Sequence, residues 1–271
     1  MSIKPDKAVA PTPTRCHTDP MCGRFSLTTE LAILRDIFGF DGPALNLKPR
    51  WNIAPTQDAP VVRLDGGVRR VAMLRWGLVP YWAEDPSVGS RMINARGETV
   101  AEKPAFKAAY RARRCLVLAD GFYDWPEQGA DKRPYLFRKS DGGAFAFAGL
   151  WETWVPGGGG VLETFTIVNC ASAPWMAQFH SRTPVVLAPD DFGAWLDPAV
   201  DPQRLIRPPE ANLFTAVRVS TYVNKPANDD ANCFTPAADE PHIAAAIADA
   251  ELSSKKKPRA KPVDDRQPSL F

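Results

Sequence analysis

The chain has 271 residues, of which 45% are hydrophobic, 10% aromatic and 24% charged, and its 33 basic and 31 acidic side chains give a formal charge of +2. This composition excludes an intrinsically disordered chain, because such chains are poor in aromatic and β-branched residues. No apolar run reaches the roughly 18 residues of a membrane-spanning helix, and the polar first twenty residues predict no secretory signal, so we expect a soluble cytoplasmic protein with no membrane partner.

Residues 1–20 contain four prolines and little apolar material, and we expect them to be a disordered extension. Apolar runs of strand length, separated by Gly, Pro and Asp, then predict strands at 61–64, 71–79, 115–119, 135–139, 144–154, 163–170, 184–188 and 214–220. Helices are predicted at 28–39, which opens with threonine caps and ends at Gly39, and at 103–113, 189–196 and 239–251. The glycine run at 157–160 predicts a hairpin loop rather than a phosphate-binding loop, because no helix start follows it.

Strands outnumber helices and do not alternate strictly with them, which is typical of an α+β fold. We therefore predict one domain over residues 21–250, built on a mostly antiparallel, barrel-like β-sheet core with a few flanking helices. Residues 251–271 are predicted to be a disordered basic tail that ends in QPSLF.

Charge is distributed unevenly along the chain. Residues 21–189 carry 20 basic and 16 acidic side chains, whereas residues 190–250 carry 4 basic and 10 acidic ones. Within the first segment, residues 91–114 hold seven basic side chains against two acidic ones. The near-neutral total therefore does not exclude a polyanionic partner, which one part of the surface could bind.

The five cysteines are irregularly spaced and include no Cys-x-x-Cys pair, so we expect neither a disulfide framework nor a metal or cofactor site. Three of them lie in or beside apolar runs and are predicted core residues: Cys115, Cys170 and Cys233. Histidine is scarce, and only His180 stands directly before a predicted strand, whereas His17 and His242 lie in the extension and in a predicted surface helix.

Cys22 follows Met21, and translation that starts at Met21 would leave Cys22 with a free α-amine once the initiator methionine is removed. Such an amine, with a reference pKa of about 8, condenses with an aldehyde to an imine, which the neighbouring thiol closes to a five-membered thiazolidine. A cysteine inside a chain can do thiol chemistry only.

Nine segments in order between residues 21 and 235 are similar to the SOS response-associated peptidase family, the SRAP domain. They are MCGRF at 21–25, WNIAPTQ at 51–57, RWGLVPYW at 75–82, MINARGET at 92–99, RRCLVLADGFYDW at 113–125, AFAGLWE at 146–152, FTIVNCAS at 165–172, FHSRTPVVL at 179–187 and VNKPANDDANC at 223–233. The resemblance implies a monomeric, nucleoid-associated α+β domain of the DNA damage response. It implies that this domain binds single-stranded DNA and captures abasic sites through an N-terminal cysteine as a thiazolidine DNA-protein crosslink, with an associated lyase activity.

The same resemblance implies four catalytic residues. Cys22 would be the nucleophile, Asn94 would orient the reacting sugar or ring, and His180 would act as general acid and base. In the fourth position the family usually has Glu, whereas this chain has Asp124 in GFYDW. Asp124 keeps the carboxylate but is shorter by about 1.5 Å, in a role where donor and acceptor must meet at about 2.6–3.2 Å.

Phosphate binding is expected from arginines in the matching segments, namely Arg24, Arg96 and Arg182, with Arg111, Arg113 and Arg114 as weaker candidates. Exposed bases could stack on Tyr81, Trp82 and Trp125, with core packing as an equal alternative for Trp82 and Trp125. Trp76 and Trp151 are predicted core residues.

The last five residues resemble the short peptides by which bacterial repair proteins bind the replication sliding clamp, with Gln267, Leu270 and Phe271 as the contacting residues. Exposed apolar side chains at the end of a polar tail otherwise need a reason.

Two other functions remain open from the sequence. One is a cysteine (auto)peptidase that uses Cys22 and His180 with Asn94 or Asp124, and the other is a DNA-binding module without chemistry. The thiazolidine reaction requires a chain that begins at Cys22, so we expect either a translation start at Met21 or proteolytic removal of residues 1–20.

Overall fold

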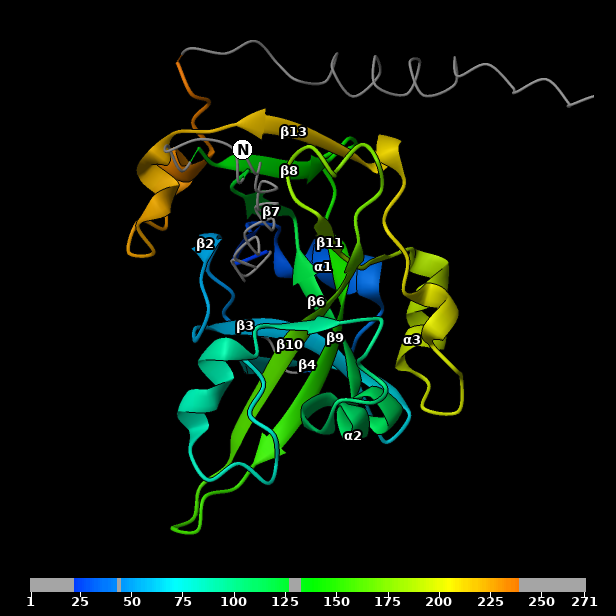
Figure 1. Cartoon of the computed structure of the whole chain (residues 1–271). Helices are drawn as coiled ribbons and strands as arrows, with labels where there is room; N and C mark the ends of the chain where they lie inside the picture. The colour runs from blue at the N-terminus through cyan, green and yellow to red at the C-terminus, as the bar shows by residue number, and fades with distance from the viewer. Residues whose placement is uncertain (1–21, 43–44, 127–132, 239–271) are drawn as a thin grey trace, which may run out of the picture.

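The structure is a computed structural model that describes residues 22–42, 45–126 and 133–238 (Figure 1). The N-terminal extension, the predicted helix at 239–251 and the tail ending in QPSLF lie outside these residues.

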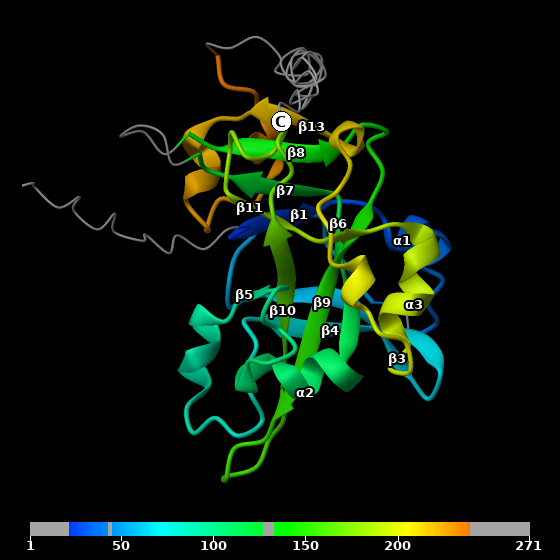
Figure 2. The same cartoon turned by 45° about the vertical axis from the view of Figure 1, so that its right-hand side comes forward.

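Two β-sheets make up the fold (Figures 1 and 2). The smaller sheet has the strand order β13 (Phe214–Arg218), β8 (Tyr135–Lys139), β7 (Gly121–Asp124), β1 (Arg24–Leu27) and β2 (Arg50–Ile53). The larger sheet has the order β11 (Arg182–Pro184), β10 (Leu162–Ala171), β4 (Val68–Trp76), β3 (Asp58–Asp65), β6 (Arg114–Ala119), β9 (Phe145–Trp154) and β12 (Val186–Leu187), and β5 (Asn94–Arg96) also pairs with β10.

The larger sheet curls into a partial ring, because β10 pairs with β9 as well as with β4. The pairing of β10 with β4 is parallel and joins only Thr164 to Arg75 and Phe165 to Trp76, whereas β3 and β4 pair antiparallel along their full length. The predicted α+β class with a mostly antiparallel, barrel-like sheet is confirmed, although the ring does not form a closed barrel.

Three α-helices flank the sheets in the described residues: α1 (Leu31–Phe38), α2 (Pro104–Ala112) and α3 (Phe192–Leu196). Short 3-10 helices cover Pro86–Arg91, Pro189–Asp191, Gln203–Leu205, Ala211–Leu213, Thr221–Asn224 and Ala231–Phe234. None of the helices in the described ranges is both long and apolar enough to cross a membrane.

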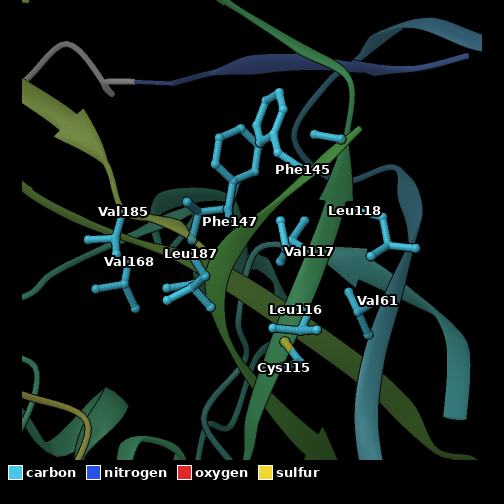
Figure 3. Packing of buried hydrophobic residues seen from close by; sticks show 14 of the residues in the cluster. Val61, Cys115, Leu116, Val117, Leu118, Phe145, Phe147, Val168, Val185 and Leu187 are labelled. Atoms are coloured by element: carbon cyan, nitrogen blue, oxygen red, sulfur yellow. The ribbon is translucent and has the colours of Figure 1, made fainter. Parts of the chain in front are cut away.

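Aromatic side chains pack the two sheets against each other. Phe25 of β1 lies 6.0 Å from Phe147 of β9 between ring centroids, and Phe122 of β7 lies 5.9 Å from Phe147. Figure 3 shows Phe145 and Phe147 above a layer of aliphatic side chains from β6, β10 and β12. Edge-to-face contacts of this kind stabilise a core beyond the burial of their area, so the core fixes how β1 and β7 lie over the larger sheet.

The predicted strands agree well with the observed ones, and the 157–160 run does join β9 to β10 in a hairpin. The predicted strand at 184–188 is divided at Val185, whose N–H donates to Val168 of β10 (2.9 Å) and whose carbonyl accepts from Ala148 of β9 (2.9 Å). Four strands were not predicted, β1, β2, β5 and β7, because they are only three or four residues long.

The predicted end of the first helix is confirmed, since Gly39 adopts a φ of 60° and its N–H donates to Arg35. The predicted threonine caps are wrong. The hydroxyls of Thr28 and Thr29 instead donate to the carboxylate of Asp120, at 2.7 and 3.1 Å. A buried carboxylate needs hydrogen-bond donors, and the two threonines supply them.

Candidate functional site

Cys22 lies two residues before the start of β1 and is only 1% exposed, within the main hydrophobic core. Its φ of 48° falls in the left-handed region, which costs a residue other than glycine about 1–2 kcal/mol. Burial raises the pKa of the Cys22 thiol well above its usual value, and the negative charge of Asp124 raises it further. The thiol is therefore protonated at neutral pH.

Asp124 reaches Cys22 through strand pairing. β1 and β7 pair antiparallel with Arg24 opposite Tyr123, which directs the Cys22 end of β1 toward Asp124 at the end of β7. Asp124 is 4% exposed, and its Oδ1 accepts a hydrogen bond from the N–H of Trp125 (2.8 Å). The register of two short strands thus brings a thiol and a carboxylate together inside the protein.

His180 stands before β11 and is buried. Its Nδ1 accepts the N–H of Arg182 (3.0 Å), so the neutral imidazole carries its proton on Nε2. The neighbouring Phe179 packs against Tyr135, with 5.0 Å between ring centroids, and Tyr135 lies opposite Asp124 in β8. The segment that carries His180 therefore contacts β8, the strand that pairs with β7 at Asp124.

Asn94 is the half-buried first residue of β5 and lies opposite Ile167 of β10. The strands β5 and β11 pair with the two edges of β10, since Asn169 faces both Arg96 and Pro184. The carboxyl end of β10 therefore positions both the segment that carries Asn94 and the segment that follows His180.

Arg24 is half-buried and binds the protein itself. Its Nη1 donates to Asn52 Oδ1 and to the carbonyl of Val223, both at 2.9 Å, and its Nη2 donates to the carbonyl of Asn224 (3.3 Å). The guanidinium also lies 5.9 Å from the ring of Trp125, whose indole N–H donates to Asn224 (2.8 Å). Arg24 thus fastens the segment 223–224 to β1.

Two residues that the sequence did not single out complete this attachment. The buried amide of Asn52 donates to the carbonyls of Val223 (3.0 Å), Lys225 (3.1 Å) and Asn228 (2.7 Å). The carboxylate of Asp229 accepts the N–H groups of Trp51 (2.6 Å) and Asn52 (2.9 Å) and pairs with Arg50. The segments WNIAPTQ and VNKPANDDANC thus contact each other. Both had been noted in the sequence as segments similar to the family, and this was the signal that could have pointed to Asn52 and Asp229.

The predicted phosphate ligands Arg96 and Arg182 differ in their surroundings. Arg182 forms a bidentate pair with Glu98 (2.8 and 2.7 Å) and donates from Nε to Asn169 (3.0 Å). Arg96 is exposed, and its side chain makes no hydrogen bond or ion pair with the residues that the structure describes. Of the two, only Arg96 has a guanidinium directed to solvent.

The three weaker candidates near α2 also separate. Arg114 is buried and donates to backbone carbonyls, including those of Tyr110 (2.7 Å) and Trp195 (2.5 Å), so it supports the fold. Arg113 pairs with the buried Glu152 (2.6 Å). Arg111 is exposed on α2. The predicted phosphate role is therefore not compatible with the position of Arg114, because a buried guanidinium already satisfied by carbonyls cannot reach a phosphate.

The aromatic candidates divide in the same way. Trp76 is fully buried and Trp151 packs partly buried against the core, as predicted. Tyr81 and Trp82 are 61% and 53% exposed. Their turn is fixed by the indole N–H of Trp154, which donates to the carbonyl of Ala83 (2.7 Å). Trp82 is thus presented on a held turn, and Trp125 lies half-buried beside Arg24.

Asp120, between β6 and β7, is a further buried polar residue that the sequence did not single out. Its carboxylate, 1% exposed, accepts from Ser26 Oγ (2.7 Å) and from the N–H groups of Thr28 and Thr29 (2.5 and 3.0 Å). It therefore ties the end of β1 to the junction of β6 and β7.

Among the residues that the structure describes, no three His, Cys, Asp or Glu side chains gather in a way that could hold a metal ion.

The chain matches the family model described as SOS response associated peptidase (SRAP) over residues 21–226. It is 39% identical to the abasic site processing protein YoaM of Bacillus subtilis, over 78% of this chain and 96% of that protein. It is 32% identical to the abasic site processing protein HMCES of Xenopus tropicalis, over 71% of this chain and 68% of that protein.

Solved structures share the fold. A protein from Bacteroides thetaiotaomicron superposes with a TM-score of 0.73 at 22% identity, over 80% of this chain and 100% of that chain. A phage-related protein from Bordetella bronchiseptica gives a TM-score of 0.59 at 27% identity, over 73% of this chain and 94% of that chain.

Proposed function

Because the chain belongs to the SOS response associated peptidase family, we propose that it processes abasic sites in DNA, the activity named in its relatives. It captures the open-chain aldehyde of the abasic sugar through Cys22 as a thiazolidine crosslink, in single-stranded DNA. The observation that carries this proposal is the position of Cys22, buried beside Asp124 with a strained backbone.

The strain at Cys22 favours a chain that begins there. The φ angle exists only while a residue precedes Cys22, so a chain that starts at Cys22 has no left-handed φ to maintain. Removal of the preceding residues therefore relieves the strain and frees the α-amine, and both changes serve the reaction.

The capture proceeds in two bond-forming steps. The α-amine of Cys22 attacks C1′ of the aldehyde, and loss of water gives an imine. The sulfur then adds to the same carbon, and the thiol proton moves to the imine nitrogen, which closes a ring of sulfur, C1′, nitrogen, Cα and Cβ. The two steps release one molecule of water and require no oxidant, reductant or metal.

Asp124 and His180 supply the proton transfers. The Asp124 carboxylate accepts the thiol proton as the sulfur adds and passes it to the nitrogen, because a thiol with a raised pKa does not ionise beforehand. The Nε2–H of His180 donates to the ring oxygen as the sugar opens, and Asn94 holds the sugar by hydrogen bonding. Asp124 thereby fills the place of the longer glutamate.

The DNA strand is held by few contacts. Arg96 offers an exposed guanidinium to a phosphate, and Trp82 and Trp125 stack on bases that flank the lesion. Arg24 and Arg182 act by holding segments beside the site, through Asn224 and Glu98 respectively.

The alternative is a cysteine peptidase built on Cys22 and His180. Such an enzyme needs a thiolate whose pKa has been lowered, usually by a histidine. Burial and Asp124 instead raise the pKa of Cys22, which favours the amine as the first nucleophile.

A crosslinking assay tests the proposal. Protein that starts at Cys22 is incubated with a single-stranded oligonucleotide that carries one abasic site, and the products are heated and separated on a denaturing gel. We expect a heat-stable crosslink that Cys22→Ala abolishes and that the control Cys170→Ala retains. Because Cys22→Ala keeps the α-amine, borohydride should trap the imine that this variant forms with the abasic site.

A heat-stable crosslink that persists in Cys22→Ala without borohydride would contradict the mechanism. DNA binding with no crosslink in any variant would indicate a DNA-binding module without chemistry.

The mature N-terminus gives an independent test. We expect the intact mass of protein purified from its native source to correspond to a chain that begins at Cys22. A functional chain that retains residues 1–20 has an amide at the Cys22 nitrogen and would refute thiazolidine formation.

A further inference from the structure

A cavity of about 560 Å³ lies where α1, α3 and β12 meet the last residue of β8 and the segment before β13. Buried apolar side chains line it, among them Phe145, Leu187 and Phe192. Val186 and Leu213 also line it and are half-buried. Pockets of about 300–1,000 Å³ with a mostly apolar lining are the usual sites at which proteins bury a ligand. This cavity, called the α3 cavity below, therefore fits an apolar occupant.

The α3 cavity and the proposed reaction site lie at opposite ends of β8. Tyr135 at the first end of β8 lies opposite Asp124, whereas Lys139 at the last end lines the cavity. β13 pairs antiparallel with β8, which places Arg218 opposite Tyr135 and Phe214 opposite Lys139. An occupant of the cavity therefore has no need to contact the residues proposed for the reaction.

The last described residues run toward the α3 cavity. Pro236 forms an antiparallel bridge with Val219, and the N–H of Ala237 donates to the carbonyl of Arg218 (3.0 Å). In an antiparallel pair the two chains run in opposite directions, so this bridge leads back along β13 from Arg218 toward Phe214. The five residues of β13 span about 17 Å at about 3.3 Å each, which is the distance that remains to the cavity end of the strand.

The sequence beyond Ala238 holds an apolar pair that can reach the cavity. Residues 239–269, which number 31, can extend to about 100 Å before Leu270 and Phe271 are reached. This length exceeds the span of β13 several times over. Leucine and phenylalanine side chains gain free energy when they leave water for an apolar site, which the lining of the α3 cavity provides.

The charge around the cavity is complementary to the charge of the tail. Both basic residues that line the cavity already form ion pairs, Lys139 with Asp141 and Arg207 with Asp191. Asp190, which follows the lining residue Pro189, and Glu210 are exposed and form no ion pair with the residues that the structure describes. Residues 255–271 carry six basic and two acidic side chains. The acidic edge of the cavity therefore attracts the tail and repels an acidic peptide.

We propose that Leu270 and Phe271 dock in the α3 cavity of their own chain, with the preceding basic residues held at its acidic edge. The inference does not depend on the chemistry proposed for Cys22. One pair of side chains cannot occupy two sites at once, so docking excludes the clamp binding predicted from QPSLF. The tail thus has a docked state, from which the clamp has to displace it.

A photoreactive group at the end of the tail tests the docking directly. The full chain carries benzoylphenylalanine in place of Phe271 and is irradiated at low protein concentration, and its tryptic peptides are identified by mass spectrometry. We expect crosslinks within one chain to the peptides around residues 139–145 and 207–213, which line the cavity. The same group in place of Pro262 is the control and should not favour these peptides.

Peptide binding gives a second measurement. A fluorescent peptide of residues 255–271 is titrated with the unaltered full chain and with Leu270→Ala/Phe271→Ala, whose cavity has lost its own occupant. A tail tethered at an effective concentration of about 1 mM competes about tenfold against a peptide with a Kd of about 0.1 mM. We therefore expect fluorescence anisotropy to show about tenfold tighter binding of the peptide to the variant than to the unaltered chain.

A substitution in the cavity locates the peptide. In the Leu270→Ala/Phe271→Ala chain, Val186→Glu introduces a charge into the apolar lining and should weaken peptide binding by about tenfold or more. Val161→Glu is the matched control, because Val161 is 69% exposed in the β9–β10 connection.

A charge reversal decides the matter even where Val186→Glu does not fold. Asp190→Lys/Glu210→Lys changes exposed side chains only and should weaken binding of the basic peptide severalfold at low salt. Glu84→Lys/Glu102→Lys, which reverses two exposed carboxylates elsewhere, should leave the affinity unchanged.

Three results would overturn the proposal. Crosslinks that form only between two chains would assign the cavity to the tail of a second copy, and crosslinks to other surfaces would leave it to a different ligand. Equal peptide affinity of the unaltered chain and Leu270→Ala/Phe271→Ala would show that the tail does not compete. Peptide affinity unchanged by both cavity variants would place the peptide elsewhere. None of these measurements uses DNA, so failure of the Cys22 chemistry would not affect them.

Discussion

The carboxylate of Asp124 and the thiol of Cys22 are buried together, and the charge of one opposes ionisation of the other. We expect Asp124→Asn to lower the pKa of the Cys22 thiol, because a neutral amide replaces a negative charge that disfavours the thiolate. The pKa should stay above its ordinary value, since burial is the larger cause and is unchanged. The pH dependence of Cys22 alkylation by iodoacetamide, followed by mass spectrometry of its peptide, reports the shift.

The same variant separates two roles of Asp124. It should crosslink more slowly although its thiol ionises more readily, because the proton acceptor for ring closure is gone. Asp85→Asn, which removes an exposed carboxylate from another part of the chain, serves as the control for both measurements. An alkylation midpoint that stays in place or moves to higher pH would show that Asp124 does not act on the thiol.

The sequence predicts which single residues have the chemistry of the site, but not which of them contact one another. Cys22 and Asp124 could be named, whereas their adjacency depends on the register of β1 with β7. Arg182 could be named as a cation, whereas its pairing with Glu98 joins positions 84 residues apart. Nothing local in a sequence encodes such a contact. The fold was therefore needed to separate the arginines that bind other parts of the protein from those that are free to contact a ligand.

At the scale of elements, long apolar strands were predictable and short ones were not. β9 and β10 have ten residues each and bury most of their side chains, which produces a clear run of apolar residues. β7 has four residues and pairs with β1 and β8 on its two sides, and β5 has three residues and pairs with β10, so both strands derive their conformation from their partners. These short strands carry Asn94 and Asp124, so the elements that build the site were those with the weakest local signal.

The turn that presents Tyr81 and Trp82 depends on two glycines. Gly77 adopts a φ of 123°, and a Cβ on it would lie 2.5 Å from the carbonyl oxygen of Gly89. We expect Gly77→Ala to lower the free energy of unfolding by about 2–4 kcal/mol, because it combines a disfavoured backbone conformation with a contact that only a backbone shift can relieve. Urea denaturation measures this loss, and affinity for single-stranded DNA should fall with it as the turn moves.

Gly157→Ala is the matched control for that substitution. Gly157 lies in the β9–β10 hairpin loop, has no atom within 4 Å of an added Cβ and does not adopt a positive φ. Its replacement should change the free energy of unfolding by less than about 0.5 kcal/mol. If Gly77→Ala were as mild as Gly157→Ala, the close approach of residues 77 and 89 would not fix the aromatic turn.

For the whole molecule, the formal charge of +2 is an average over unlike surfaces. The segment 91–114 contributes seven basic side chains against two acidic ones, whereas residues 190–238 are mainly acidic and include Asp191, Asp197 and Asp201. From this distribution of charge we expect the protein to bind DNA through a limited set of contacts, so that its non-covalent affinity depends on salt through few phosphates. In the proposed reaction, persistence on the lesion comes from the covalent bond.

The C-terminal residues QPSLF lie outside the described residues, and the sequence predicts that they bind a second partner, the replication sliding clamp. We expect Gln267→Ala/Leu270→Ala/Phe271→Ala to abolish clamp binding in isothermal titration with the purified clamp, because the anchoring side chains are removed. Ser269→Ala, one position away, should bind the clamp as the unaltered chain does, and a synthetic QPSLF peptide should compete.

Crosslinking to abasic DNA in the absence of the clamp, by a chain that starts at Cys22, needs only the folded domain. A triple variant that loses both clamp binding and crosslinking would therefore point to a general defect of the protein. Unchanged clamp affinity in the triple variant would contradict the prediction and would instead make QPSLF an apolar chain end with no role in clamp binding.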